Sequence, residues 1–194
     1  MKNLIIATTN TGKFTELKPL LSGHFEEIYS LLDFPDTIDV LEDSPSYAGN
    51  AMKKARKTGE HFCMPALADD SGLEVHILDG RPGLYSSRYG KNDDERIVRL
   101  LNELDGVPWE KRNAKFKAYV ALYLPEKDRC YVFYGELKGF IGFEKHGSHG
   151  FGYDPVFYSP ELGKYLAEIS TEEKNRFSHR GRAIALLKKF VETI

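Results

Sequence analysis

Two long segments in which apolar and polar residues alternate constrain the fold of this chain more than any other feature. They span residues 114–124 and 130–140, and a turn at residues 125–128 separates them. A period of two residues is typical of β-strands, and a connection this short joins antiparallel strands. The sequence therefore predicts a long antiparallel hairpin.

Segments before the hairpin carry strand and helix patterns in turn. Apolar residues 4–7 predict a short buried strand, and apolar residues at helical spacing follow from Phe14 to Leu21. Residues 8–13 are therefore expected to form a strand-to-helix turn. Residues 46–62 predict a second helix with a solvated face of lysines. These lysines are Lys53, Lys54 and Lys57.

Two acidic residues stand inside the next strand pattern. Residues 66–68 read as a strand, and residues 73–77 continue it in extended form. Asp69 and Asp70 lie between these two parts. We interpret them as an interruption of the strand.

Helices mixed with short and long strands favour an α/β fold. Asn92 and Glu95 resemble a capping box that opens one further helix, and apolar spacing over residues 183–190 predicts another. We expect a mixed sheet with the long antiparallel hairpin, arranged as two lobes around a central cleft. No repeat, linker or low-complexity tract divides residues 1–194, so a single domain is expected.

The composition argues against several classes of protein. The chain has 194 residues, 29% of them charged, and a formal net charge of -2, which favours a mixed-sign surface over a nucleic-acid-binding face. The apolar run near the start is too short for a signal sequence or a membrane span, so a cytoplasmic protein without a membrane partner is expected. Cys63 and Cys130 show no metal-ligand spacing, so we expect two buried reduced thiols.

The strand-to-helix turn carries groups that suit a polyphosphate. Hydroxyl, amide and ammonium donors lie beside the free backbone N–H groups of a helix start. The turn is not a Walker loop, because Ala7 and Phe14 stand where that motif needs glycine and then Ser or Thr. An ordinary N-capped helix with an exposed lysine explains the turn equally well. The candidate phosphate-binding residues are Thr8, Thr9, Asn10, Thr11, Gly12 and Lys13.

Asp69 and Asp70 are candidate ligands of a metal ion. Adjacent residues of a strand point to opposite faces, so both could bind one Mg2+ only if the chain bends there. Glu42, in a polar segment before the second helix, is the best candidate for a further carboxylate, because Mg2+ prefers a few carboxylates with waters and phosphates. A simple turn at residues 69–72 is the alternative.

Cations at the start of the last helix form a third candidate group. Ser178 could cap this helix, which would put His179 and Arg180 in its first turn. That position is unfavourable for cations unless an anion or a ligand lies beside them. Lys174 adds another cation nearby, although a single lysine before a helix is most often solvated.

Residues 147–155 form a glycine-rich loop with an aromatic residue between two glycines. Phe151 has the surroundings expected where a ring stacks on a base and the backbone approaches closely. The alternative is a hydrophobic anchor for the loop, a role that Tyr153 or Phe157 could equally fill.

Five ordered motifs are similar to those of the inosine triphosphate pyrophosphatase family. They are Thr-Thr-Asn-Thr-Gly-Lys at 8–13, Ala-Asp-Asp-Ser-Gly at 68–72, Gly-Leu-Tyr-Ser-Ser-Arg at 83–88, Gly-Phe-Gly-Tyr-Asp-Pro at 150–155 and Ser-His-Arg-Gly at 178–181. The resemblance runs from the first strand to the last helix and implies an ITPase-like fold.

The resemblance also implies a function. It implies a homodimeric, Mg2+-dependent hydrolase that converts ITP, dITP and XTP to the monophosphate and pyrophosphate, and so keeps deaminated purines out of nucleic acids. The turn at 8–13 and Ser71 would hold the triphosphate. Glu42, Asp69 and Asp70 would organise metal and water, with Asp70 as the proton acceptor. The residues that would enclose the base and sugar are Phe151, Gly152, Tyr153, Asp154, Lys174, His179 and Arg180.

The chemistry of these groups is consistent with such a reaction. A metal ion and Lys13 would neutralise phosphate charge while a carboxylate orients water toward the α-phosphorus. For selectivity, we expect Lys174 or Arg180 to donate to the purine 6-oxo group, since adenine presents an amino donor there.

Two alternative functions stay open on the sequence alone. One is a module that senses nucleotides without turnover, and the other is a phosphatase that releases orthophosphate. The clustered carboxylates disfavour the sensor, because they repel a triphosphate unless a cation bridges them.

Overall fold

The computed structural model of the chain describes residues 3–35 and 38–193. Contacts between Cα atoms divide the chain into two compact units, each assembled from separate segments of sequence. The first unit contains Met1–Asp70, Ala118–Gly135 and Arg180–Ile194, and the second contains Ser71–Lys117 and Glu136–His179. The expectation of a single domain stays a prediction.

Within the described residues, the strands form one mixed sheet of seven, in the order β2-β1-β3-β4-β5-β6-β7. β1 runs parallel to β2 and β3, whereas β6 runs antiparallel to β5 and β7. A short turn joins the neighbours β4 and β5, which confirms the predicted hairpin and the mixed α/β class. The strands are β1 (Asn3–Ile6), β2 (Glu27–Ser30), β3 (Ala66–Val75), β4 (Asn113–Leu124), β5 (Arg129–Ile141), β6 (Phe157–Ser159) and β7 (Lys164–Tyr165).

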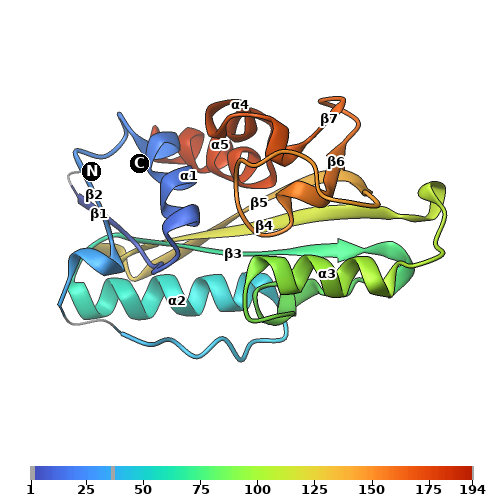
Figure 1. Ribbon diagram of the computed structural model, residues 1–194. Coiled ribbons are helices and arrows are strands. Elements are labelled where there is room, and N and C mark those ends of the chain that lie inside the picture. The colour runs from blue at the N-terminus through green and yellow to red at the C-terminus, as the bar shows by residue number, and fades with distance from the viewer. Residues whose placement is uncertain (1–2, 36–37, 194) are drawn as a thin grey trace. The chain divides into compact units, whose positions relative to one another are not determined.

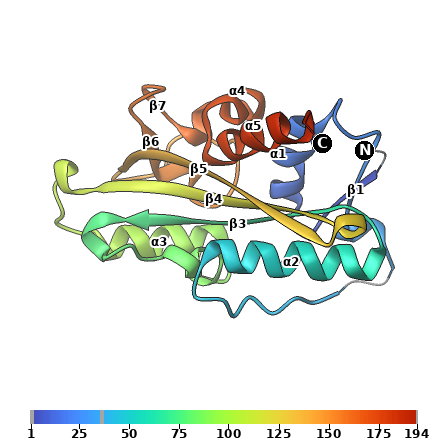
Figure 2. The same cartoon turned by 180° about the vertical axis from the view of Figure 1, so that it is seen from behind.

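In the first unit, helices cover both faces of the strands (Figures 1 and 2). α1 (Thr11–Leu21) and α5 (His179–Val191) lie on one face, and α2 (Tyr47–Phe62) lies on the other. β1 divides its side chains between them, because successive residues of a strand point to opposite faces. Leu4 and Ile6 pack with α1 and α5. Ile5 and Ala7 pack on the side of α2.

Capping side chains set where the helices of the first unit begin. Ser46 Oγ accepts a hydrogen bond from Gly49 N–H at the start of α2. Asn10 Oδ1 accepts one from Lys13 N–H at 3.0 Å at the start of α1. Such caps satisfy backbone N–H groups that have no partner within the helix. The predicted second helix at residues 46–62 is therefore confirmed.

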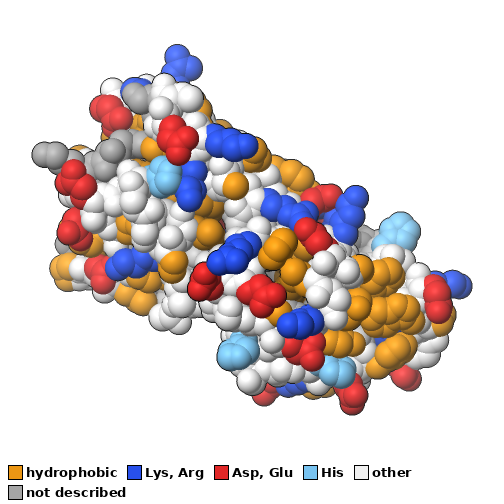
Figure 3. Space-filling model, turned by 90° about the horizontal axis from the view of Figure 1, so that it is seen from above, with side chains coloured by type: hydrophobic (Ala, Val, Ile, Leu, Met, Phe, Trp, Pro, Cys, Tyr) orange, Lys and Arg blue, Asp and Glu red, His pale blue; other side chains and the backbone are white. Residues whose placement is uncertain are grey.

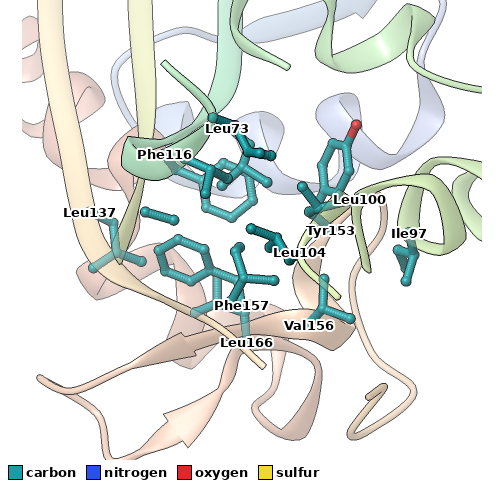
Figure 4. Packing of buried hydrophobic residues seen from close by; sticks show 14 of the residues in the cluster. Leu73, Ile97, Leu100, Leu104, Phe116, Leu137, Tyr153, Val156, Phe157 and Leu166 are labelled. Carbon is teal, nitrogen blue, oxygen red and sulfur yellow. The ribbon is translucent and has the colours of Figure 1, made fainter. Parts of the chain in front are cut away.

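The second unit has its own hydrophobic core, shown in Figure 4. α3 (Asp93–Glu103) contributes Ile97 and Leu100 to this core. The rings of Phe116 from β4 and Phe157 from β6 pack together with 4.6 Å between their centroids. Asn92 caps α3 as predicted, accepting from Glu95 N–H at 2.9 Å. A short helix that the sequence analysis did not predict, α4 (Thr171–Phe177), completes the unit.

Two expectations from the sequence are wrong. β3 is continuous from Ala66 to Val75, so Asp69 and Asp70 do not interrupt a strand. Each of these acids finds polar or cationic partners on its own face of β3, which allows them to stay in the strand. The two thiols are also not both buried. Cys130 is half-buried, and Cys63 is exposed because it caps α2 at a φ of 51°, where the chain leaves the helix.

Charges of both signs are interspersed on the face of the molecule that Figure 3 shows, where hydrophobic side chains also gather in one patch. This face agrees with the mixed-sign surface expected from the composition. Among residues 3–35 and 38–193, no helix combines the length and the apolar character needed to cross a membrane.

Candidate functional site

The turn between β1 and α1 presents the predicted phosphate-binding residues at the start of a helix. Thr9, Asn10 and Thr11 are exposed, and the other three are half-buried. Thr8 Oγ1 accepts a hydrogen bond from Asn10 N–H at 3.1 Å, which tightens the turn. The backbone N–H groups of the first helical turn and the Lys13 ammonium group together favour an anion at this place.

Asp69 and Asp70 turn their carboxylates to opposite faces of β3. Asp69 follows the alternation of Leu67, which packs with α1 and α5, and Asp70 follows that of Ala68, which packs with α2. Both side chains are buried, since Asp69 is 4% exposed and Asp70 is 8% exposed. The strand therefore directs one carboxylate to each face, and the two acids belong to different groups of side chains.

Asp69 belongs to a buried network of charges on the side of α1 and α5. Lys13 Nζ lies 2.9 Å from Asp69 Oδ2 and donates to the Asp69 carbonyl oxygen at 3.1 Å. Arg180 Nε lies 3.2 Å from Asp69 Oδ2, and Arg180 Nη1 lies 3.0 Å from Glu16 Oε2. These two carboxylates supply the negative charge that a cation in the first turn of α5 requires, as the sequence led us to expect.

Asp70 belongs to a second group, on the side of α2. Asn50 Nδ2 donates to Asp70 Oδ2 at 3.1 Å, and Lys54 Nζ lies 2.6 Å from Glu42 Oε1. Burial raises the pKa of the Asp70 carboxyl. The nearby Lys13 and Lys54 ammonium groups oppose this rise in pKa, and the Glu42 carboxylate adds to it. Glu42 and Asp70 are thus close enough to interact electrostatically.

Lys13 lies in surroundings that oppose its charge. Burial lowers the pKa of its ammonium group, and the Asp69 carboxylate counteracts this effect. The positive charges of Lys54 and Arg180 lower the pKa of Lys13 further. An additional anion beside Lys13 would offset this repulsion between the three cations.

In the second unit, Asp154 and Lys174 hold the glycine-rich loop. Asp154 Oδ2 accepts a hydrogen bond from Phe151 N–H at 2.9 Å and pairs with the Lys174 ammonium group. Asp154 and Lys174 are each 2% exposed, so this ion pair is fully buried. The Lys174 ammonium also lies 5.1 Å from the centroid of the Phe151 ring, within cation–π range. The structure thereby brings together three residues expected near the base.

Two other predicted residues are packed into the core of the second unit. His179 stacks on Phe116, with ring centroids 4.8 Å apart and an angle of 11° between the planes. The Tyr153 hydroxyl donates to the Ser86 carbonyl oxygen at 2.9 Å, and burial raises the pKa of Tyr153. Tyr153 therefore serves as an anchor of the loop, the role considered above for its aromatic residues.

The remaining predicted residues of the second unit are Gly152 and Ser71. Gly152 follows Phe151 with a φ of 63°, and Ser71 is half-buried in β3.

The sequence analysis missed three residues of these networks, Glu16, Asn50 and Lys54. The expectation that Lys54 lies on a solvated face is wrong, because its side chain pairs with Glu42 and is only 15% exposed. Residues 47, 50, 51, 54, 55 and 58 follow helical spacing along one face of α2, and that spacing could have identified Asn50 and Lys54. Glu16 lies three residues after Lys13, on the same side of α1.

The carboxylates of Glu42 and Asp70 offer a donor set for a metal ion. Within the part of the chain that the structure describes, no three His, Cys, Asp or Glu side chains are gathered as a metal site. Mg2+, however, needs only a few protein carboxylates, because waters and substrate phosphates complete its coordination. The two carboxylates on the side of α2 fit this requirement: Asp70 accepts from the neutral amide of Asn50, and Glu42 pairs with Lys54. Asp69, in contrast, contacts both Lys13 and Arg180.

Comparison with known proteins finds relatives over the whole chain. The model of the Ham1 family matches residues 4–190. The dITP/XTP pyrophosphatase of Geobacillus kaustophilus is 46% identical over 100% of this chain and 96% of its own. The dITP/XTP pyrophosphatase of Geobacter sulfurreducens is 48% identical over 97% of this chain and 96% of its own.

Solved structures of Ham1 proteins are similar to this chain in fold and in sequence. A HAM1 protein from Coxiella burnetii has a TM-score of 0.87 at 36% identity and covers 100% of both chains. The Ham1 protein of Staphylococcus aureus has a TM-score of 0.86 at 36% identity and covers 99% of both chains. The similarity of fold and sequence confirms the resemblance that the five motifs indicated.

Proposed function

The chain belongs to the Ham1 family, and we propose that it hydrolyses non-standard purine nucleoside triphosphates to the nucleoside monophosphate and pyrophosphate. The relatives named dITP/XTP pyrophosphatase support dITP and XTP as substrates, and ITP carries the same base as dITP. Such an activity removes deaminated purine nucleotides before they enter DNA or RNA.

The observation that carries this proposal is the group of three cations at the start of α1. Lys13 and Arg180 both contact the carboxylate of Asp69, Arg180 also contacts Glu16, and the positive charges of Lys54 and Arg180 lower the pKa of Lys13. A helix N-terminus beside these cations adds unpaired N–H groups. A triphosphate provides the several negative charges that such a place accommodates.

In the proposed reaction, water attacks the α-phosphorus, and the bond from that phosphorus to the oxygen shared with the β-phosphate breaks. Pyrophosphate leaves with the electron pair of this bond, and the attacking water gives its proton to the Asp70 carboxylate. Asp70 is a buried carboxylate that the Asn50 amide holds in place, which supports its role as the proton acceptor. The turn at residues 8–13 and Ser71 bind the phosphates, and Lys13 neutralises their charge.

Glu42 and Asp70 would hold Mg2+, which when bound supplies charge neutralisation and lowers the pKa of water. Asn50, which donates to Asp70, and Lys54, which pairs with Glu42, orient these two carboxylates. Asp69 as a further metal ligand stays a prediction, and its contacts favour a different task, the positioning of Lys13 and Arg180.

The base would bind at the loop of the second unit. Phe151 offers a ring for stacking, and Lys174, fixed by Asp154, offers a donor to the purine 6-oxo group. Contacts of His179 and Arg180 with the base stay predictions. If Arg180→Ala weakened the turnover of ATP and ITP equally, Arg180 would not select the base.

The proposal includes a homodimer in the cytoplasm, without a nucleic-acid or membrane partner. This part rests on the resemblance to the family and on the mixed-sign surface. Sedimentation of the purified protein at micromolar concentration checks it, and a monomer there would contradict the dimer.

Anion-resolved hydrolysis of ITP, XTP, GTP and ATP, with and without Mg2+, tests the reaction. We expect metal-dependent release of pyrophosphate from ITP and XTP, and little turnover of GTP and ATP. In Asp70→Asn the rate constant should fall by about 100- to 10,000-fold, because the proton acceptor is lost. Asp43→Asn is the matched control, since Asp43 is an exposed carboxylate that pairs with Lys53.

The other outcomes favour the alternatives. Release of orthophosphate would indicate a phosphatase, and binding without turnover would indicate a nucleotide sensor. Unchanged activity in Asp70→Asn, with metal-dependent pyrophosphate release in the wild type, would leave the reaction in place and remove Asp70 from its role.

A further inference from the structure

We propose that Asp93 is a positioning residue for the base, because its carboxylate holds the backbone of the loop that carries Phe151. Gly152 N–H donates to Asp93 Oδ2 at 2.7 Å. Asp93 is the first residue of α3 and lies 59 positions before Gly152, outside the five motifs that indicated the family. The inference rests on the proposed function, since it assumes that this loop binds the base.

The geometry makes this hydrogen bond a constraint on the loop. Gly152 has no side chain and a φ of 63°, a conformation that L residues rarely adopt, so only its backbone can anchor this point of the loop. An N–H bonded to a carboxylate is held more strongly than one bonded to a neutral acceptor. The loop at Gly152 is therefore fixed by a group from α3.

Asp93 is itself held in place by Arg96, whose side chain is fixed in turn by a second hydrogen bond. Arg96 Nη1 donates to Asp93 Oδ1 at 2.6 Å, and Arg96 Nε donates to the Gly90 carbonyl oxygen at 3.2 Å. The two oxygens of Asp93 thus have different partners, one in α3 and one in the loop. Because α3 begins at a fixed cap, Asn92, the position of the Asp93 carboxylate is set by the helix.

Two carboxylates consequently fix two successive N–H groups of the loop. Asp154 accepts from Phe151 N–H at 2.9 Å, and Asp93 accepts from Gly152 N–H at 2.7 Å. The peptide groups before and after Phe151 are both fixed, and with them the direction in which its ring leaves the backbone. A ring held in this way loses less conformational freedom when a base stacks on it, which lowers KM without acting on the bond that breaks.

Steady-state kinetics with XTP and Mg2+ test the inference in three variants. In Asp93→Ala we expect KM to rise about 3- to 10-fold and kcat to stay within about twofold, because a charge-assisted hydrogen bond is lost away from the phosphates. Asp93→Asn keeps an oxygen that can accept from Gly152 N–H, so its KM should stay within about twofold of the wild type. Asp94→Ala is the matched control, since Asp94 is the adjacent acid of α3 and pairs with the Lys145 side chain instead of the loop backbone.

Hydrogen exchange at the Gly152 amide gives a second readout that needs no substrate. Asp93→Ala should exchange this amide faster than the wild type, Asp93→Asn should exchange it less fast than Asp93→Ala because it keeps a neutral acceptor, and Asp94→Ala should not differ from the wild type. Faster exchange together with the selective rise in KM supports the inference. An unchanged KM in Asp93→Ala, an equal rise in Asp94→Ala, or an equal loss in Asp93→Asn would overturn it, and so would failure of both Asp93 variants to fold.

Phe151→Ala separates this inference from the assignment of the loop. If Phe151→Ala raises KM for XTP and Asp93→Ala does not, the loop binds the base and Asp93 does not position it. If Phe151→Ala leaves KM unchanged, the loop does not bind the base, and the role of Asp93 falls with that assignment.

Discussion

Among the residues that the structure describes, each compact unit buries one arginine, and the two arginines are held in different ways. Arg180 in the first unit is 5% exposed and contacts the carboxylates of Glu16 and Asp69. Arg112 in the second unit is 2% exposed and donates to four backbone carbonyl oxygens. Those carbonyls belong to residues 104, 107, 141 and 142.

The difference separates a cation held only by the backbone, Arg112, from Arg180, for which we propose a role in function. Backbone carbonyls do not titrate, so Arg112 joins segments of the second unit in the same way whatever else is bound. The partners of Arg180 are ionisable, and one of them, Asp69, also holds Lys13. A ligand that adds negative charge beside Lys13 therefore changes the electrostatic interactions of Asp69 with Lys13 and Arg180. The hydrogen bonds of Arg112 do not depend on that charge.

Arg112→Met should have the largest effect on stability. Removal of the guanidinium group takes this donor from four carbonyl oxygens, of which the Leu104 carbonyl keeps the Val107 N–H as a donor. An unsatisfied buried group costs about 1–3 kcal/mol, so a loss of about 3 kcal/mol or more is expected. Urea unfolding followed by circular dichroism measures it. A loss below about 1 kcal/mol would mean that water replaces the guanidinium group, and Arg112 would not be structural in the sense proposed here.

Glu16→Gln should destabilise the first unit less and also impair catalysis. The amide keeps the size of the side chain and an acceptor oxygen but removes one of the two negative charges beside Arg180, at a cost of about 2 kcal/mol. Arg180 would then be attracted more strongly to Asp69, and the ion pair between Lys13 and Asp69 would weaken. We expect lower kcat/KM for XTP in the folded variant. Unchanged kcat/KM would place Glu16 and Arg180 with Arg112 as purely structural.

Phe151→Ala should affect binding of the base and little else. Stacking of a base on an aromatic ring contributes about 1–3 kcal/mol, so KM for XTP should rise about 10-fold. This loss should vary little with ionic strength, because it involves no phosphate contact. A loss that disappeared at high salt would contradict stacking as its cause and would indicate an effect of exposed charges instead.

Glu172→Gln should have the smallest effect and serves as the control for Glu16→Gln. Like Glu16, Glu172 pairs with an arginine, in this case Arg176, four residues later in α4. The Glu172 and Arg176 side chains are 82% and 68% exposed. The Glu16 and Arg180 side chains are 4% and 6% exposed. Exposed pairs of this spacing contribute about 0.3–0.5 kcal/mol, so the unfolding midpoint should hardly move. A loss as large as that of Glu16→Gln would remove burial as the reason for the difference.

Local patterns predicted much of the fold. The long hairpin and the bounds of α2 follow from periodicity and a capping serine, which act over a few residues. β6, β7 and α4 are three, two and seven residues long, too short to impose a period, and they were missed.

The parts of the candidate site that are contiguous segments of sequence were predictable. The parts that depend on contacts between residues distant in sequence were not. The turn at residues 8–13 and the aromatic loop are short contiguous segments, and both were identified. Glu16, Asn50 and Lys54 gain their importance from partners that lie 12 to 164 positions away, such as Glu42 and Arg180. No local pattern shows such partners, although the spacing of polar residues on the buried face of α2 gave a hint.

Because β3 is uninterrupted, the face of the sheet on which each acid lies depends on whether its position in the strand is odd or even. Asp69 reaches the charges of α1 and α5, and Asp70 reaches Asn50 on α2, only because they are consecutive in an extended chain. Deletion or insertion of one residue between Leu67 and Asp69 would exchange the two carboxylates between the faces while leaving composition and charge almost unchanged. This segment should therefore tolerate conservative substitutions far better than any change in its length.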